Sequence, residues 1–210
     1  ATTAHAVMQL NAEDGGNRKY IMVQLPEETP EDSEARKAGY DTIPEIAKER
    51  IRRAGKKIKK ESPLTTQNLD TGFRVFRLAD SNFEEVKKAP AEYDQSQLDL
   101  FLNNVKSDRT DLDLLFGAML SWGVQLSLPM TSEEVDGKMI YSVNDGDLVA
   151  CFADDITENI VKAMADKQPL RVLFRDSCFA RDDAKINVFE TLKQLLDWSE
   201  EEAIKNIKVI

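Results

Sequence analysis

The chain has 210 residues, enough for one large domain or two small ones, because domains of about 100 to 150 residues are the commonest. With 41% hydrophobic and 31% charged residues, its composition is that of a folded protein and excludes a disordered chain. No apolar run approaches the roughly 18 residues of a membrane span, and the N-terminal segment lacks the layout of a signal peptide. We therefore expect a soluble, cytoplasmic protein that does not contact a membrane.

The net charge of −10 is distributed unevenly along the chain. Residues 1–70 carry twelve Lys and Arg and twelve Asp and Glu, whereas residues 71–210 carry sixteen basic and twenty-six acidic residues. An acidic surface repels phosphate, so the second part alone is a poor candidate for nucleic-acid binding. The two parts are expected to face different partners.

The chain opens with a predicted helix followed by a predicted strand. Thr2 or Thr3 is a candidate N-cap, and the Gly-Gly pair at 15–16 is a typical helix end. The run YIMVQL at 20–25 has the length and the apolar character of a strand buried on both faces, as in a parallel sheet.

A basic helix and a second strand follow. Residues 26–41, rich in Pro and charge, predict a loop, and the pattern from Thr42 to Glu45 is a capping box. The helix that it opens has an apolar stripe, formed by Ile43, Ala47, Ile51, Ala54 and Ile58. Its many Lys and Arg at 48–60 either follow a phosphate backbone or form the solvated side of an ordinary amphipathic helix. GFRVFRL at 72–78 predicts another strand, which indicates α/β organisation.

After a predicted linker at 89–94, the second part is predicted to be a small α/β domain with an antiparallel meander. The predicted helices are 98–105, 110–123, 157–165 and 186–198, with a short last helix opened by a capping box from Ser199 to Glu202. Three short β runs lie within 133–153, separated by the turn signals Asp136-Gly137 and Asn144-Asp145-Gly146. Further strands are predicted at 170–174 and 207–210.

Few residues are candidates for chemistry. His5 is the only histidine, which excludes metal or catalytic sites that require two. Cys151 and Cys178 lie in apolar contexts, which favours reduced core thiols. Asp176 follows a predicted strand, where α/β sheets often place functional groups, and a nuclease-like site with Lys185 is one hypothesis. Turn formation explains this aspartate equally well.

The start of the chain has the pattern of half a nucleotide-type site. The N-terminus of a helix offers free N–H groups to an anion, and the end of the next strand offers a side chain to ribose hydroxyls. Thr2 and Thr3 stand at the first position and Gln24 at the second.

Five ordered blocks of the sequence resemble a known family, the C-terminal part of the modification subunit of type III restriction–modification systems. The blocks are TTAHAVMQLN, GGNRKYIMVQLPE, GYDTIPEIAKERIRRAGKKIK, GFRVFRLADSNF and RVLFRDSCFARDDAKIN. Members of this family are bacterial adenine-N6 DNA methyltransferases that use S-adenosylmethionine. The resemblance implies that residues 1–88 are the rear part of a Rossmann-like, S-adenosylmethionine-dependent methyltransferase domain and that residues 89–210 form an α/β assembly domain.

The resemblance also implies that the chain is a C-terminal fragment without catalytic residues. The family's Asp-Pro-Pro-Tyr motif and its glycine-rich cofactor loop would both precede Ala1, and no Pro-Pro pair occurs in the sequence. The fragment is therefore expected to be inactive alone. Thr2 and Thr3 would approach the carboxylate end of the cofactor, and Gln24 would approach its ribose. Ala1 replaces a frequent glycine, and Gln24 replaces a carboxylate with a weaker, neutral partner.

The partners implied by the resemblance are DNA, a second modification subunit in a homodimer, and a restriction subunit with helicase and nuclease activities. An alternative interpretation is a non-catalytic module that dimerises or docks the restriction subunit, with the partial cofactor half incidental.

Overall fold

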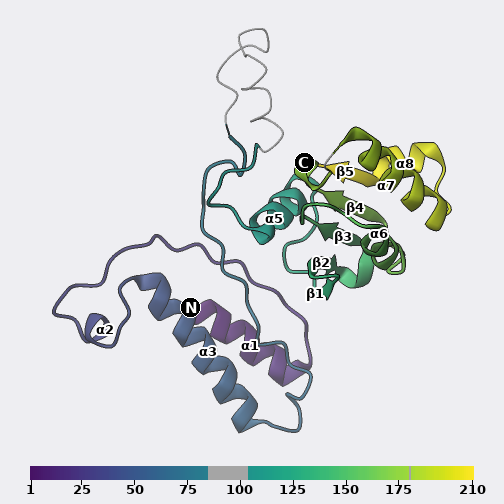
Figure 1. Cartoon of the computed structure of the whole chain (residues 1–210). Coiled ribbons are helices and arrows are strands. Elements are labelled where there is room, and N and C mark those ends of the chain that lie inside the picture. The colour runs from purple at the N-terminus through teal and green to yellow at the C-terminus, as the bar shows by residue number, and fades with distance from the viewer. Residues whose placement is uncertain (85–103, 180) are drawn as a thin grey trace. The chain divides into compact units, whose positions relative to one another are not determined.

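The computed structural model describes residues 1–84, 104–179 and 181–210. The chain divides into two compact units, unit 1 with Ala1–Phe76 and unit 2 with Arg77–Ile210 (Figure 1). The domain boundary predicted between residues 88 and 89, the predicted linker at 89–94 and most of the predicted helix at 98–105 lie outside the described residues.

Unit 1 is built on two packed helices, α1 (Thr2–Asp14) and α3 (Ile43–Glu61). Both helices were predicted, and the apolar stripe of α3 meets that of α1. Their shared core consists of Ala4, Met8, Ile51, Ala54 and Ile58. Helix α1 ends at Gly15, whose φ of 70° lies in the left-handed region that glycine adopts without strain.

The prediction that Thr2 or Thr3 caps α1 is wrong. The N-cap is Ala1, and both threonines already belong to the helix, where their backbone cannot take the extended conformation of a capping residue. Thr42 is the N-cap of α3 as predicted, but its side chain makes no capping hydrogen bond. The partner expected for it, Glu45, forms an ion pair with Lys48 instead.

The loop between the two helices contains one short helix that the sequence did not predict, α2 (Glu34–Lys37). The Ser33 hydroxyl caps it by accepting the Arg36 N–H. The Arg36 guanidinium in turn donates to the carbonyl of Thr29 at 2.9 Å and pairs with Asp41 at 3.2 Å. The loop is therefore folded around one arginine.

The strands predicted at 20–25 and 72–78 do not form. Neither run pairs with a strand within the described residues, and without such a neighbour an apolar run has no ladder of hydrogen bonds. Several of their apolar side chains are open to solvent instead, with Ile21 94%, Val23 92% and Leu78 105% exposed, whereas Tyr20 and Phe73 pack against the core of unit 1.

Unit 2 contains a five-stranded sheet whose strands follow one another in sequence order, β1-β2-β3-β4-β5. The strands are β1 (Met130–Val135), β2 (Lys138–Val143), β3 (Leu148–Cys151), β4 (Arg171–Phe174) and β5 (Ile207–Val209). The first three form the predicted antiparallel meander, and β3, β4 and β5 are parallel. The turn between β1 and β2 uses Asp136 and Gly137, whose φ values of 51° and 74° suit a two-residue hairpin.

Helices cover both faces of this sheet, which makes unit 2 a three-layer α/β fold (Figure 1). The helices are α5 (Asp111–Ser121), α6 (Glu158–Ala165), α7 (Asp182–Leu195) and α8 (Glu200–Asn206), with single 3-10 turns at Asn144–Gly146 and Asp176–Cys178. Helix α5 packs on one face of the sheet and the other three on the opposite face. The capping box from Ser199 to Glu202 forms as predicted. The expectation of a mixed α/β domain with a meander is confirmed.

The apolar side chains of α5 differ in burial. Leu115 and Met119 lie in the core, whereas Leu112 and Leu120 are 40% and 70% exposed. Among the described helices, none is both long and apolar enough to cross a membrane.

Candidate functional site

The N-terminus of α1 is open to an anion. The first intrahelical hydrogen bond is donated by His5 to the carbonyl of Ala1 at 3.2 Å, so the N–H groups of Thr2, Thr3 and Ala4 point out of the helix end. The first turn carries no acidic residue, and both threonine side chains are exposed. Free N–H groups, two hydroxyls and the positive end of the helix dipole together suit a carboxylate.

Gln24, the third residue predicted at the site, lies on the exposed extended run at 20–25. Its side-chain amide donates to the carbonyl of Leu25 at 3.3 Å, and its side-chain oxygen has no hydrogen bond within the described part of unit 1. No hydrogen bond among the described residues joins Gln24 to Thr2 or Thr3. Within the described part of unit 1, the predicted contact residues therefore lie on two separate segments, the first turn of α1 and the extended run at 20–25.

A buried asparagine fixes the path from α1 to the extended run. The Asn11 side chain, 8% exposed, accepts the Arg18 N–H at 3.0 Å and donates to the Arg18 carbonyl at 3.0 Å. The Arg18 guanidinium pairs with Asp14 at 2.7 Å, and this hydrogen-bonded cation lowers the pKa of the Asp14 carboxyl. Asn11 lies on the buried face of α1. A polar residue on such a face is the signal in the sequence that could have indicated these hydrogen bonds to the backbone of Arg18.

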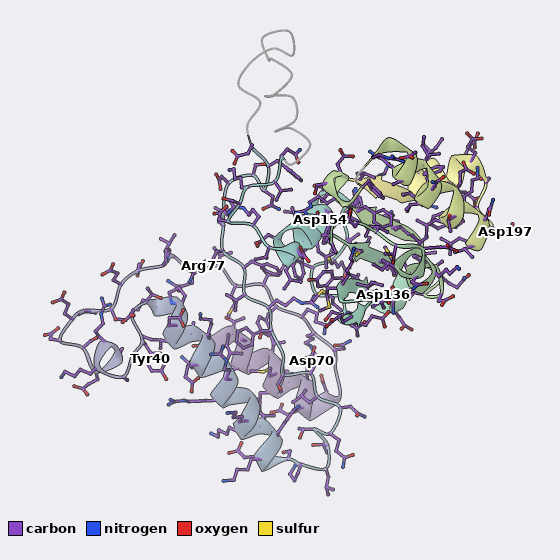
Figure 2. The ribbon with its side chains drawn as sticks, in the orientation of Figure 1. Tyr40, Asp70, Arg77, Asp136, Asp154 and Asp197 are labelled. Carbon is purple, nitrogen blue, oxygen red and sulfur yellow. The ribbon has the colours of Figure 1, made fainter. Side chains whose placement is uncertain are left out.

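The starts of the two exposed runs are tied together. Lys19 pairs with Asp70 at 3.1 Å, although 51 residues separate them in the chain; Asp70 is labelled in Figure 2. Asp70 also accepts the Gly72 N–H at 2.9 Å, and this bond, followed by the one from Lys19, lowers the pKa of its carboxyl. The neighbouring Tyr20 hydroxyl is buried without a described partner, and burial raises its pKa. An ion pair therefore joins a residue just before the first run to a residue just before the second.

Unit 2 carries a hollow of about 230 Å³ beside the edge strand β5. Its lining is mostly apolar, with Phe179, Phe189 and Ile204 among the residues, and it includes Lys185. The Lys185 ammonium pairs with Asp176 at 2.6 Å, so the two residues of the nuclease-like hypothesis do meet. Within residues 1–84, 104–179 and 181–210, however, no group of three His, Cys, Asp or Glu side chains is arranged to hold a metal ion.

The two cysteines are buried free thiols in the core of unit 2, as the sequence predicted. Cys178 donates to the carbonyl of Cys151 at 3.7 Å, and burial raises the pKa of Cys178 to about 12. At neutral pH both are protonated and therefore poor nucleophiles.

Comparison with known proteins identifies relatives. The chain is 49% identical over 78 residues to the Mod subunit of the type III restriction–modification enzyme StyLTI from Salmonella typhimurium, a match that covers 37% of this chain and 12% of that protein. It is 31% identical over 190 residues to the Mod subunit of the type III enzyme EcoP15I from Escherichia coli, covering 85% of this chain and 26% of that protein.

The chain is homologous to type III Mod subunits. The resemblance seen in the sequence is thereby confirmed. The matched regions span about an eighth and about a quarter of the lengths of these two Mod subunits. No model of a protein family matches the chain.

Proposed function

We propose that the chain is the C-terminal part of an adenine-N6 DNA methyltransferase of a type III restriction–modification system. Homology over 85% of the chain to a Mod subunit is the observation that carries this proposal. In the intact enzyme the methyl donor is S-adenosylmethionine and the acceptor is an adenine flipped out of a DNA duplex. The chain alone is inactive, because the sequence holds no Pro-Pro pair and therefore no Asp-Pro-Pro-Tyr motif to receive the flipped base.

The cofactor contacts of this chain are Thr2, Thr3 and Gln24. The open N-terminus of α1 holds the carboxylate of the cofactor, and the free side-chain oxygen of Gln24 accepts a hydrogen bond from a ribose hydroxyl. When bound, S-adenosylmethionine supplies an electrophilic methyl group on its sulfonium. The residues of this chain contribute position and not proton transfer, so their effect is on cofactor affinity and alignment.

The exposed runs at 20–25 and 72–78 become neighbouring strands of the Rossmann-like sheet in the complete methyltransferase domain. Their apolar side chains, with Ile21 and Val23 more than nine-tenths exposed, are the support for this proposal. The ion pair between Lys19 and Asp70 already holds the starts of both runs together. Helices α1 and α3 then cover one face of that sheet.

A chimeric enzyme tests the proposal. The segment of the EcoP15I Mod subunit that aligns with this chain is replaced by this chain, and methyl transfer from tritiated S-adenosylmethionine to DNA is measured. We expect transfer by the chimera and none by the chain alone. Gln24→Glu in the chimera restores a charged acceptor and should tighten cofactor binding, whereas Gln24→Ala should weaken it. A folded chimera that binds DNA and transfers no methyl group would refute the proposal, as would turnover by the chain alone.

Unit 2 supports a second candidate function, docking of the restriction subunit or of a second modification subunit. The apolar hollow beside β5 lies in a unit that carries fifteen basic and twenty-six acidic residues, which fits protein contact better than DNA contact. Ile204 lines the hollow and is 60% exposed, whereas Leu170 is 64% exposed and does not line it. Ile204→Lys should abolish co-purification with the restriction subunit, and Leu170→Lys should not. A wild-type chain that is monomeric by light scattering and retains no restriction subunit would exclude this role.

A further inference from the structure

Helix α3 carries more positive charge than its ion pairs and its packing within unit 1 account for. Between Arg50 and Lys60 seven of eleven residues are Lys or Arg and none is acidic. All seven side chains are exposed, because Ile51, Ala54 and Ile58 turn the opposite side of the helix to α1. Six acidic residues of unit 1 lie instead in the loop at 26–41. The unit has almost no net charge, and its positive charge is gathered on one helix.

Only part of this basic face is neutralised by neighbours. Glu49 pairs with Arg53 at 2.7 Å and lies 3.9 Å from Arg52, and Glu61 lies 3.7 Å from Lys57. The remaining cations form no ion pair within the described part of unit 1; these are Arg50, Lys56, Lys59 and Lys60. In contrast, Lys162 on α6 and Lys193 on α7 each pair with a glutamate one turn away.

The arrangement costs the helix stability. Lys56 has Lys59 three residues ahead and Lys60 four residues ahead, so like charges are adjacent on the helix surface. Like charges one turn apart destabilise a helix. A face that served only for solvation would be better built with glutamates between the lysines. Glu49 and Asp70 attract Lys56 and Lys59 without forming ion pairs with them, and a bound polyanion would relieve the repulsion that is left.

Two arginines on the same helix are held in place. The Arg52 guanidinium lies 5.7 Å from the centre of the Phe73 ring, and Arg53 donates to the Tyr40 hydroxyl at 3.3 Å; Tyr40 is labelled in Figure 2. Anchoring lowers the conformational entropy that these side chains lose on binding a ligand. The basic face is therefore partly ordered before any partner arrives.

We propose that the exposed face of α3 binds the phosphate backbone of a DNA duplex without regard to sequence. That the polyanion is DNA rests on the proposed function. From Arg50 to Lys60 the helix rises about 15 Å, and a duplex carries one charge per about 1.7 Å of its axis, so about nine phosphate charges lie along that length. Seven cations lie over this span, and four of them form no ion pair in the described part of unit 1. No aromatic side chain is interleaved with them, which fits contact with phosphates and not stacking on bases.

Neutralisation of three unpaired lysines tests this surface. The variant Lys56→Gln, Lys59→Gln, Lys60→Gln keeps good helix formers at these positions. Its matched control removes three exposed lysines from unit 2, through Lys162→Gln, Lys205→Gln and Lys208→Gln. Binding of the whole chain to a fluorescent DNA duplex of arbitrary sequence is followed by anisotropy at several salt concentrations, and stability is followed by urea denaturation.

We expect the α3 variant to bind at least about tenfold more weakly at low salt and to show a less steep salt dependence. Three lost phosphate contacts reduce the slope of log K against log salt by about 2.7. Raising the salt from about 50 to about 200 mM should therefore weaken DNA binding by the variant about 40-fold less than it weakens binding by the wild type. The control variant should keep the wild-type slope. Because like-charge repulsion is removed, the α3 variant should be as stable as the wild type or slightly more stable.

Three outcomes would overturn the proposal. They are no duplex binding by the wild-type chain, equal losses in the two variants, and tighter binding of polyglutamate than of the duplex, which would indicate an acidic protein partner. The test is separable from that of the methyltransferase. If the chimera is active and the α3 variant binds DNA as the wild type does, the proposed function stands and the α3 surface is refuted. If the chimera is inactive and the α3 variant has lost DNA affinity, the α3 surface stands and the proposed function is refuted.

Discussion

Truncation of Leu173 to alanine should destabilise unit 2 severely. Leu173 lies in β4, is 0% exposed and packs in the cluster between the sheet and α5. The change removes three carbon atoms, worth about 0.8 kcal/mol each in transfer free energy, and leaves a cavity. Comparable substitutions cost about 2.7–5 kcal/mol, so we expect a loss of about 3.5 kcal/mol. This is a large part of the about 5–15 kcal/mol of a typical domain.

Urea denaturation followed by tryptophan fluorescence measures this loss. Both tryptophans, Trp122 and Trp198, belong to unit 2, so the signal reports on that unit alone. With a denaturant slope of about 2 kcal/mol per M, the midpoint of Leu173→Ala should fall by about 1.5–2 M. The control Leu170→Ala, at a side chain 64% exposed, should move the midpoint by less than about 0.3 M. Equal shifts in the two variants would refute the assignment of β4 to the centre of the core.

Two further expectations concern backbone and thiols. Gly146→Ala should lower the melting temperature of unit 2 more than Gly137→Ala. At Gly146, whose φ is 109°, an added Cβ would lie 2.6 Å from the Lys167 carbonyl oxygen, whereas an added Cβ at Gly137, whose φ is 74°, would meet open space. Equal falls in melting temperature would contradict this. Cys151 and Cys178 should resist a thiol reagent at pH 8 in the folded chain and react in urea, because burial raises the pKa of both; prompt reaction of either thiol without denaturant would show that it is not buried.

Two runs of similar sequence illustrate what can be predicted. LRVLF at 170–174 and YIMVQL at 20–25 are both short, apolar and β-prone, and both were predicted as buried strands. The first becomes β4 because β3 and β5, encoded in the same chain, supply hydrogen bonds on both sides. The second has no such neighbour among the described residues and stays exposed. An apolar run indicates that a segment is suited to burial. It does not show whether neighbouring strands are present to pair with it.

Capping patterns show a similar limit. Two helix starts were predicted from a Ser or Thr followed by Glu three residues later, at Thr42 and at Ser199, and of these two Ser199 alone forms the reciprocal bonds. At Thr42 the glutamate is drawn to Lys48, a competing cation that lies one turn further along the helix. The helix start is thus predicted correctly from either pattern, whereas the side-chain bonds depend on what else is within reach.

The cofactor contacts predicted from the sequence stay a prediction, and the structure adds only where these residues lie. Thr2 and Thr3 do stand at the open end of α1, and Gln24 is free to accept a hydrogen bond. Residues that enclose a ligand come from several segments, and their convergence is a property of the folded whole. The exposed lysines of α3 are the opposite case. Their charge pattern is evident from the sequence, and the structure was needed only to show which way the side chains face.

The order of strands in unit 2 has a consequence for folding. Each strand pairs only with its predecessor and successor in the chain, so the sheet can grow strand by strand without threading a later strand between two earlier ones. The antiparallel pairs β1–β2 and β2–β3 are close in sequence and cost little loop-closure entropy, whereas the parallel pairs join residues as far apart as Leu148 and Arg171 or Val172 and Ile207 and are expected to form more slowly. Because β5 is the last strand added, the edge of β4 stays open until the end, and the hydrogen bonds that close it are made by Ile207–Val209. Until β5 is in place, this edge can pair with a strand of another chain.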